Sequence, residues 1–345
     1  MDKRIILLTG AGFTKNFGGF LADEMWAYIF NHKNIQISKE LKDLAYKHFN
    51  YEDLYDEVLK SEKNLPAFIE VIDKAYQLQE KSIKANLINR SQIPINFCEF
   101  LKSHVASIFT LNQDLCFETS IISTKGTAID LQFELPFSPD NRKAHPFDKS
   151  PKLLPSKKEL DKLEKTTDIS NNLNYFKLHG STTYYSSILP GQKVLVIGRE
   201  KNKLIANEPL LNKYKIIFEQ NLQEDNQSLL VIGYSFLDEH INEVIESGLK
   251  NGLKLYIVDT LSPEEFKRKM LDEEIKEFKQ GAVRLQIKGK KHGIDKNNNI
   301  AYLNVKLAST KMNIFKSMAG YYPFDLIQFL DQHNLGFFKE NVGLV

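Results

Sequence analysis

Short apolar runs divide the chain, and each of them ends in small or polar residues. Four of them cover residues 5–9, 106–110, 175–178 and 229–232, and a fifth, 253–258, ends at Asp259. Continuous apolar runs of this length are typical of parallel strands that are buried on both faces. Residues 283–287 are a candidate sixth strand. The pattern therefore predicts five or six buried parallel strands.

Helical periodicity fills several of the stretches between these runs. Apolar residues recur at helical spacing between positions 210 and 222, and Ser262 with Glu265 forms a capping-box pattern at the start of another helix. Strands that alternate with helices are typical of an α/β fold with a Rossmann-like, doubly wound parallel sheet. We expect residues 1–290 to form one domain of this kind.

Two segments interrupt the alternation. Residues from about 21 to 105 carry amphipathic helical patterns without a convincing strand, so we expect an all-helical insertion in the sheet domain. Residues from about 137 to 172 are rich in Pro, Lys and Ser, which predicts an exposed excursion with one short helix near Glu159. The extension 291–345 ends in a surplus of apolar residues, which is either a packing strap on the domain or an oligomer contact.

Composition narrows the classes of function. The chain has 345 residues, and 46 basic against 44 acidic side chains give a net charge of +2. This balance lacks the basic footprint of a dedicated nucleic-acid binder, so we expect no direct binding to nucleic acid. No apolar run is long enough to span a bilayer, and we expect a cytoplasmic protein. Two cysteines, Cys98 and Cys116, exclude a four-thiolate zinc site and a disulfide framework, and we expect no metal.

A glycine-rich turn, Thr9-Gly10-Ala11-Gly12-Phe13-Thr14, follows the first run directly. Glycines at this place let the backbone approach a pyrophosphate and point free N–H groups at it. Taken alone the turn is a weak signal. Lys15 stands where a dinucleotide fingerprint has its third glycine, and no second strand follows, so an ordinary dehydrogenase is disfavoured.

Polar residues follow three of the other runs, and each group has a structural alternative. Asn112 and Asp114 end the segment that begins at Thr110, where they would face the ligand crevice or merely cap the next helix. His179 precedes a glycine at another strand end, a position suited to proton transfer, although a lone histidine is more often structural. In the fourth motif, Gly233 permits a close approach and Ser235 can bind a phosphate or ribose oxygen; Asp238 and His240 read as structural or supporting residues.

The four motifs in this order resemble the sirtuin family. The resemblance rests on Gly10-Ala11-Gly12, Thr110 to Asp114, Leu178-His179-Gly180 and Gly233-Tyr234-Ser235, and covers roughly residues 4 to 260. The stretch from Gly233 to Asn242 looks like a divergent bacterial branch whose members hydrolyse NAD⁺ in anti-phage defence. The chain lacks the four-cysteine zinc module and the peptide-binding segment of the protein deacylases.

The resemblance implies a site for NAD⁺ as substrate. Asn112 would position the ribose and a water, and His179 would act as the base. Asp114 would bind the nicotinamide carboxamide. Asp259, at the end of the fifth run, is placed either to bind the adenine ribose or to cap the helix or turn that follows it. The diphosphate would lie on the glycine turn, and further contacts would come from other motif residues. The implied cofactor-binding residues are Gly10, Ala11, Gly12, Phe13, Thr14, Thr110, Asp114, Gly233, Ser235 and Asp259.

The implied function is hydrolysis of NAD⁺ to ADP-ribose and nicotinamide, in an NAD-depleting effector that causes abortive infection. Such an activity needs gating, so the resemblance also implies a homo-oligomer or a partner such as a HerA-type ATPase or an Argonaute-like protein. Two alternatives stay open. One is an NAD-dependent deacylase or ADP-ribosyltransferase of the same fold, and the other is a non-enzymatic module that binds NAD⁺ or ADP-ribose.

Overall fold

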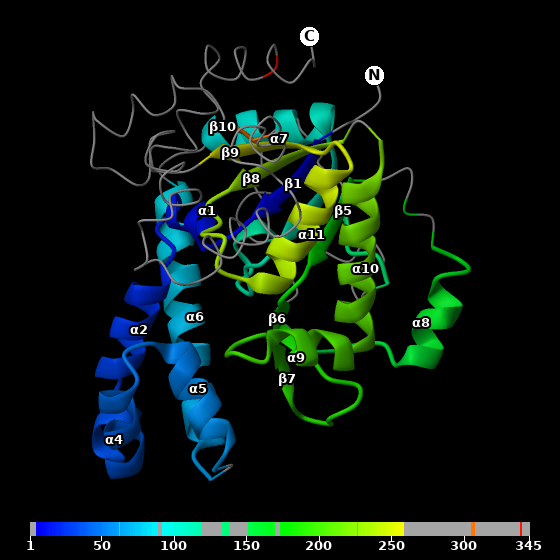
Figure 1. The fold of residues 1–345 in the computed structure, drawn as a ribbon. Helices are drawn as coiled ribbons and strands as arrows, with labels where there is room; N and C mark the ends of the chain where they lie inside the picture. The colour runs from blue at the N-terminus through cyan, green and yellow to red at the C-terminus, as the bar shows by residue number, and fades with distance from the viewer. Residues whose placement is uncertain are drawn as a thin grey trace, which may run out of the picture.

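A parallel β-sheet with helices on both faces forms the centre of the protein (Figure 1). The computed structural model describes residues 5–61, 63–88, 92–118, 133–137, 151–167, 169, 173–225, 227–258, 305–307 and 339. Asp259, the candidate strand 283–287, the capping box at Ser262 and nearly all of the extension 291–345 lie outside these residues.

The main sheet has the strand order β10-β9-β8-β1-β2-β5-β3, and every neighbouring pair is parallel. Its strands are β1 (Ile5–Thr9), β2 (Val105–Thr110), β3 (Phe133–Glu134), β5 (Leu173–Lys177), β8 (Ser228–Ile232), β9 (Lys254–Val258) and β10 (Val305–Leu307). The five apolar runs thus become strands whose ends differ from the prediction by two residues at most. Every residue of β1, β5 and β8 is buried, as expected for strands covered on both faces.

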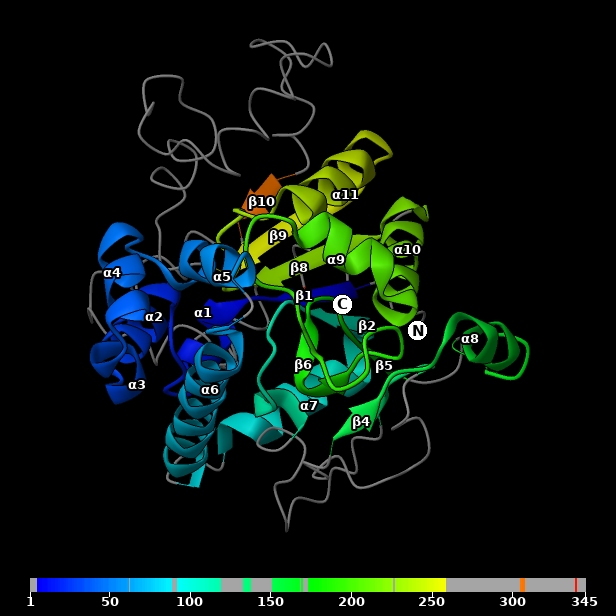
Figure 2. The ribbon, with the colours of Figure 1, turned by 90° about the horizontal axis from the view of Figure 1, so that it is seen from below.

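Helices cover both faces of this sheet, which confirms the doubly wound arrangement. Helices α10 (Pro209–Gln223) and α11 (Glu239–Lys250) pack against each other on one face. Helix α7 (Gln92–His104) packs against β2 on the opposite face, as the view along the layers shows (Figure 2). The apolar side of α10, predicted from its spacing, is buried at six positions against the sheet core: Leu210, Leu211, Tyr214, Ile217, Phe218 and Leu222.

The described part of the segment between β1 and β2 consists of helices joined by turns and short irregular links, without a strand, which confirms the all-helical insertion. Between the short helix that follows β1 and helix α7, the helices extend from the sheet as a separate lobe (Figure 1). A second apolar core lies within this lobe and includes Leu195 and Ile197 from outside it, so the lobe packs onto that segment. The helices before α7 are α1 (Ala11–Lys15), α2 (Ala22–Asn31), α3 (Lys33–Ile37), α4 (Lys39–Lys47), α5 (Tyr51–Leu59) and α6 (Leu65–Ile88).

A small second sheet was not predicted. It has the order β4-β6-β7, with β4 (Lys152–Leu153), β6 (Gly180–Tyr185) and β7 (Lys193–Leu195). Two short helices, α8 (Lys157–Leu163) and α9 (Lys201–Asn207), lie in the same part of the chain, and α8 is the helix expected near Glu159. The expectation of an exposed excursion needs correction at Leu154 and Leu160, which are buried in the main core. No described helix has the length and apolar character that crossing a bilayer requires.

Candidate functional site

The glycine turn after β1 packs directly against the loop after β8. The N–H of Gly10 donates to Ile232 O at 3.1 Å, and the N–H of Gly12 donates to Gly233 O at 2.8 Å. A Cβ on Gly10 would lie 2.6 Å from Gly233 O, and a Cβ on Gly12 would lie 2.7 Å from Gly233 Cα. Gly233 itself has a φ of +66°, which favours glycine. These glycines are therefore required for the contact between two backbones.

This packing corrects the expectation of a turn whose N–H groups are all free for a pyrophosphate. The amides of Gly10 and Gly12 donate to the neighbouring loop, and the amide of Phe13 donates to Gly10 O at 2.9 Å. The ring of Phe13 is buried in the core, and the Thr14 hydroxyl, also buried, donates to Ala11 O at 3.0 Å. Ala11 is the exposed residue of the turn, so a ligand would meet the turn there.

Asn112 lies against the same turn. Its Nδ2 donates to Gly10 O at 2.9 Å, and its backbone N–H donates to Thr110 Oγ1 at 3.1 Å. Thr110 Oγ1 also accepts a hydrogen bond from Thr9 Oγ1 at 2.8 Å, so Thr110 organises the ends of β1 and β2 from within. The half-buried carboxamide of Asn112 is thus held in a fixed orientation. Its Oδ1 accepts no hydrogen bond from the described residues and is free for a ligand.

Asp114, by contrast, is engaged with the protein through both carboxylate oxygens. Oδ1 accepts the N–H of Cys116 at 2.8 Å, and Oδ2 accepts Gln79 Nε2 from α6 at 2.9 Å. Burial raises the pKa of Asp114 to about 6, although the Lys177 ammonium beside it opposes the shift. The bond to the N–H of Cys116, two residues further along the chain, is a local contact of the kind that the capping alternative expected.

Lys177, the last residue of β5, forms a buried ion pair that the sequence analysis missed. Its Nζ donates to Asp114 O at 2.6 Å and to Glu118 Oε1 at 2.8 Å. Asp114, Glu118 and Lys177 are called the buried charge cluster below. The sequence signal for this ion pair is a lysine at the end of an apolar strand. Its partner, Glu118, lies 59 positions away in the chain and could not be identified from the sequence.

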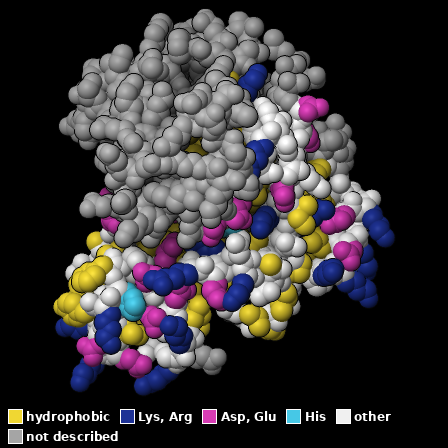
Figure 3. Space-filling model, viewed as in Figure 1, with side chains coloured by type: hydrophobic (Ala, Val, Ile, Leu, Met, Phe, Trp, Pro, Cys, Tyr) yellow, Lys and Arg dark blue, Asp and Glu magenta, His cyan; other side chains and the backbone are white. Residues whose placement is uncertain are grey.

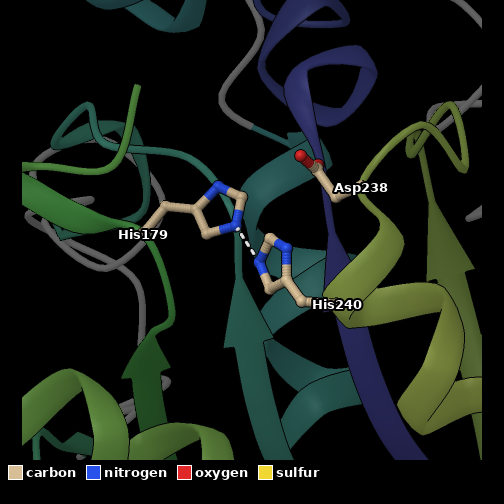
Figure 4. A group of neighbouring side chains, drawn as sticks. All are labelled: His179, Asp238 and His240. Carbon is tan, nitrogen blue, oxygen red and sulfur yellow. Dashed lines mark hydrogen bonds between the residues drawn. The ribbon is translucent and has the colours of Figure 1, made fainter. Parts of the chain in front are cut away.

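His179 follows β5 and lies beside a second histidine from α11 (Figure 4). His179 Nε2 is 2.9 Å from His240 Nε2, and both rings are buried. Asp238 lies next to them, and one ligand atom from each of the three residues falls within 4.8 Å of the others. These three residues are called the histidine cluster. The sequence marked His240 as structural or supporting, and its contact with the candidate base could not be read from a separation of 61 residues.

Burial dominates the electrostatics of the histidine cluster. It lowers the pKa of His179 to about 3 and that of His240 to about 4, while the Asp238 carboxylate opposes both shifts. Both rings are therefore neutral at physiological pH, and the Nε2 of one donates to the Nε2 of the other. Burial alone would raise the pKa of Asp238, but His179 and Lys201 bring it below its usual value. Lys201 Nζ lies 2.7 Å from Asp238 Oδ1 and 3.0 Å from Glu52 Oε1 in the helical lobe.

The loop after β8 is fixed from within and presents one exposed hydroxyl. The Tyr234 hydroxyl donates to Asn242 Oδ1 at 3.0 Å, and Asn242 Nδ2 donates to Phe236 O at 2.8 Å. Ser235, between these anchored residues, is exposed. Asp238 occupies the N-cap position of α11, yet its side chain makes no capping bond and pairs with Lys201 instead.

The sheet brings the four motifs side by side. Strands β8, β1, β2 and β5 are neighbours, and their last residues pair as Ile232 with Thr9, Thr9 with Thr110, and Thr110 with Lys177. The glycine turn, Asn112, His179 and Ser235 all follow these carboxyl ends, where ligands bind in open α/β sheets. Asp259 lies outside the described residues.

Comparison with known proteins agrees with this arrangement. A family model described as a SIR2-like domain matches residues 106–278, about half of the chain. The match includes Asn112, His179 and the motif at Gly233, whereas the glycine turn precedes it. No curated protein matches the chain.

Proposed function

We propose that this chain, which belongs to the family of SIR2-like domains, hydrolyses NAD⁺ to ADP-ribose and nicotinamide. Family membership supports an NAD-related function in general. The observation that carries the finer proposal is the position of Asn112 and His179. They follow neighbouring strands, and Asn112 is fixed against the glycine turn by its bond to Gly10 O.

Cleavage of NAD⁺ breaks the bond between the nicotinamide nitrogen and the ribose C1′. The electron pair leaves with nicotinamide, which becomes neutral, and positive charge grows on the ribose as in glycoside hydrolysis. A water oxygen then bonds to C1′, and one proton is released. The site must therefore hold the ribose and deliver a water. Asn112 suits this role because its bond to Gly10 leaves Oδ1 free to accept from a ribose hydroxyl or a water.

His179 suits the role of proton acceptor. Its low pKa makes it a weak base, but a water that attacks a cationic sugar becomes strongly acidic, so a weak base suffices. If His179 donates its Nε2–H to His240, its lone pair is on Nδ1, and His240 selects that tautomer. General base catalysis of this kind contributes roughly 10²–10⁴-fold.

Exposed residues at the strand ends are the candidates for contacts with the rest of NAD⁺. Ala11 and Ser235 are exposed beside the carboxyl ends of β1 and β8, and we assign them to the diphosphate or a ribose oxygen. Asp114 can reach a nicotinamide carboxamide only if Gln79 releases Oδ2, because both of its oxygens bind protein groups.

Product analysis tests the proposal. The full chain, alone and with the protein from a neighbouring gene, is incubated with NAD⁺, and nicotinamide and ADP-ribose are quantified. We expect Asn112→Ala and His179→Ala to lower the rate at least about 100-fold. Asn221→Ala and His48→Ala, which alter the same residue types on α10 and at the end of α4, should leave it unchanged.

Three outcomes would contradict hydrolysis. Full activity in His179→Ala would reject the base. Binding of NAD⁺ without release of nicotinamide would favour a non-enzymatic module. Turnover that requires a peptide or another acceptor would favour a deacylase or transferase.

We also propose that assembly or a partner gates the activity, as in an NAD-depleting effector of anti-phage defence. The helical lobe supports this idea, because Ile37 and Phe49 on it are 81% and 78% exposed, and hydrophobic side chains gather there (Figure 3). Size-exclusion chromatography with and without the neighbouring gene's protein, such as a HerA-type ATPase or an Argonaute-like protein, tests it. An unchanged elution volume that corresponds to a monomer in both cases would reject gating by assembly.

A further inference from the structure

The histidine cluster contains the donor set of a transition-metal site. Two imidazoles and a carboxylate are ligands that Zn²⁺ and its neighbours in the first transition row accept. We propose that His179, His240 and Asp238 bind a divalent metal ion of the Zn²⁺ class, and that the bound ion switches off the NAD⁺-cleaving site. The switch rests on the proposed function, whereas metal binding does not.

The geometry needs little adjustment. Two nitrogens at 2.0–2.1 Å from a tetrahedral ion lie about 3.3–3.4 Å apart. His179 Nε2 and His240 Nε2 are 2.9 Å apart, so the rings have to separate by only a few tenths of an ångström. Figure 4 shows that the two Nε2 atoms face each other while each Nδ1 points away. Three protein ligands would leave a fourth position for water or substrate.

Asp238 is the third ligand, and Lys201 competes for it. Lys201 Nζ is 2.7 Å from Asp238 Oδ1, so the ammonium already neutralises this carboxylate. A carboxylate has a second oxygen, and a metal ion can share Asp238 with Lys201 at a cost in affinity because two cations then lie close together. The site is therefore expected to bind metal reversibly. Removal of the ammonium should strengthen binding.

Metal binding and base catalysis exclude each other, whichever nitrogen of His179 acts as the base. A metal at Nε2 takes the lone pair of that atom and breaks the bond between the two histidines. The proton of the neutral ring then moves to Nδ1, so Nδ1 becomes a donor. His179 is left without a lone pair for the water. The metal-bound protein should not cleave NAD⁺.

Direct binding is tested with Co²⁺, which reports its ligands by visible d–d absorption. The wild-type chain, first treated with a chelator and dialysed, should develop intense bands on titration with Co²⁺, and Zn²⁺ should displace them. His240→Gln and His179→Ala should abolish the bands, and Asp238→Asn should weaken Co²⁺ binding at least about tenfold. His48→Ala is the control and should bind as the wild type does. Circular dichroism confirms the fold of each variant.

Lys201→Met tests the carboxylate's part. We expect tighter Co²⁺ binding in this variant, because the competing ammonium is gone. Bands that are absent in the wild type, or unchanged in His179→Ala and His240→Gln, would overturn the site. Unchanged affinity in both Asp238→Asn and Lys201→Met would remove Asp238 from it.

Assays of NAD⁺ cleavage in the presence of Zn²⁺ distinguish a failure of the metal switch from a failure of the proposed function. If the wild type cleaves NAD⁺, then Zn²⁺ at concentrations that displace Co²⁺ should inhibit cleavage, and a chelator should restore it. Residual cleavage by His240→Gln should be insensitive to Zn²⁺. Cleavage that persists in the Zn²⁺-bound wild type would overturn the switch. Failure of all NAD⁺ cleavage with normal Co²⁺ bands would reject the proposed function and leave the metal site standing.

Discussion

Two buried polar clusters lie at the carboxyl end of the main sheet, one beside β2 and β5 and the other between β5 and α11. In the buried charge cluster, Lys177 Nζ donates to Asp114 O, Glu118 Oε1 and Tyr175 OH at 2.6, 2.8 and 3.4 Å. An ammonium has three donors, so its capacity is used completely. In the histidine cluster, the two rings bond to each other through one nitrogen each.

The difference separates a structural cluster from a reactive one. A buried charge whose partners are all protein groups can only hold the fold together, because a ligand would have to break its bonds. A pair of neutral rings keeps a nitrogen on each ring for other partners, and its internal bond can open at a low cost. The two histidine rings are buried to a similar degree as the members of the buried charge cluster, so saturation of the hydrogen-bonding groups rather than depth distinguishes the rings from that cluster.

Lys177→Met should cause the largest loss of unfolding free energy. Loss of the ammonium leaves the carboxylate of Glu118 buried without a counter-charge, and its Oε2 already has no hydrogen-bond partner among the residues that the structure describes. Removal of one member of a buried pair costs about 3–5 kcal/mol. Urea unfolding followed by circular dichroism should report a loss of unfolding free energy of that size.

A double variant shows whether the uncompensated charge is the cause. Lys177→Met combined with Glu118→Gln should recover a large part of the loss, because residue 118 then no longer buries a charge without its partner. A double variant as unstable as the single one would mean that packing around Lys177, and not the ion pair, stabilises this region.

His240→Ala should lower the unfolding free energy less than Lys177→Met does, but it should clearly slow NAD⁺ cleavage. The variant leaves His179 without the partner that selects its tautomer, so NAD⁺ cleavage should fall about 10- to 100-fold. His240→Gln should recover part of the rate, because an amide oxygen can accept from His179 Nε2. Steady-state kinetics should locate the loss in kcat. Equal losses in both variants would reduce His240 to a packing residue.

The sequence predicted the five central strands of the main sheet well because each of them carries its own signal, whereas the edge strands β3 and β10 were not predicted. Leu229 to Ile232 and the other apolar runs are continuous, and burial on both faces requires that continuity. The same rule explains why β6 was missed. Its residues, Gly180 to Tyr185, are mostly polar, and they pair with β7 in a small sheet that needs no apolar run.

The sequence predicted which residues of the candidate site follow the strand ends, but it did not predict the hydrogen-bond partners of their side chains. Asn112 and His179 were recognised because motif order survives in the chain, and the sheet then brings their strands together. The bonds of His179 to His240 and of Lys177 to Glu118 join positions about 60 residues apart, and only folding creates them. The motif also names Phe13 and Thr14 without giving their orientation, and the structure shows that both side chains are buried.

Asp114→Asn should change how stability depends on pH. The pKa of Asp114 is about 6 in the folded chain because of burial; Lys177 opposes the shift, and Glu118 and Glu80 add to it. The unfolded residue ionises near pH 3.9, about two units lower. As pH rises between these values, the unfolded chain loses its proton first, so the favourable contribution of Asp114 is complete below about pH 4 and disappears by about pH 6.

Comparison of the wild type with Asp114→Asn isolates the contribution of Asp114 to the pH dependence of stability. The unfolding free energy of the wild type minus that of Asp114→Asn, measured by urea at several values between pH 4 and pH 7, should fall with rising pH and then level off. The depressed pKa values of His179 and His240 act in the opposite direction but are present in both proteins, so they cancel. A difference that rises with pH would mean that Lys177 dominates over burial at Asp114.

Arg199→Ala should change the unfolding free energy least. This variant tests whether an exposed ion pair stabilises the protein as a buried one does. Arg199, just before α9, and Lys201, its first residue, both form ion pairs with acidic residues on α5, but the Arg199 side chain is 76% exposed and that of Lys201 only 16%. Arg199 bonds to Asp53 at 2.7 Å, and an exposed pair of this kind contributes about 0–1 kcal/mol. We expect a change of unfolding free energy within that range and unchanged NAD⁺ cleavage. A loss as large as that of Lys177→Met would mean that the contact between the lobe and the sheet domain, rather than the saturation of buried groups, controls stability at this edge.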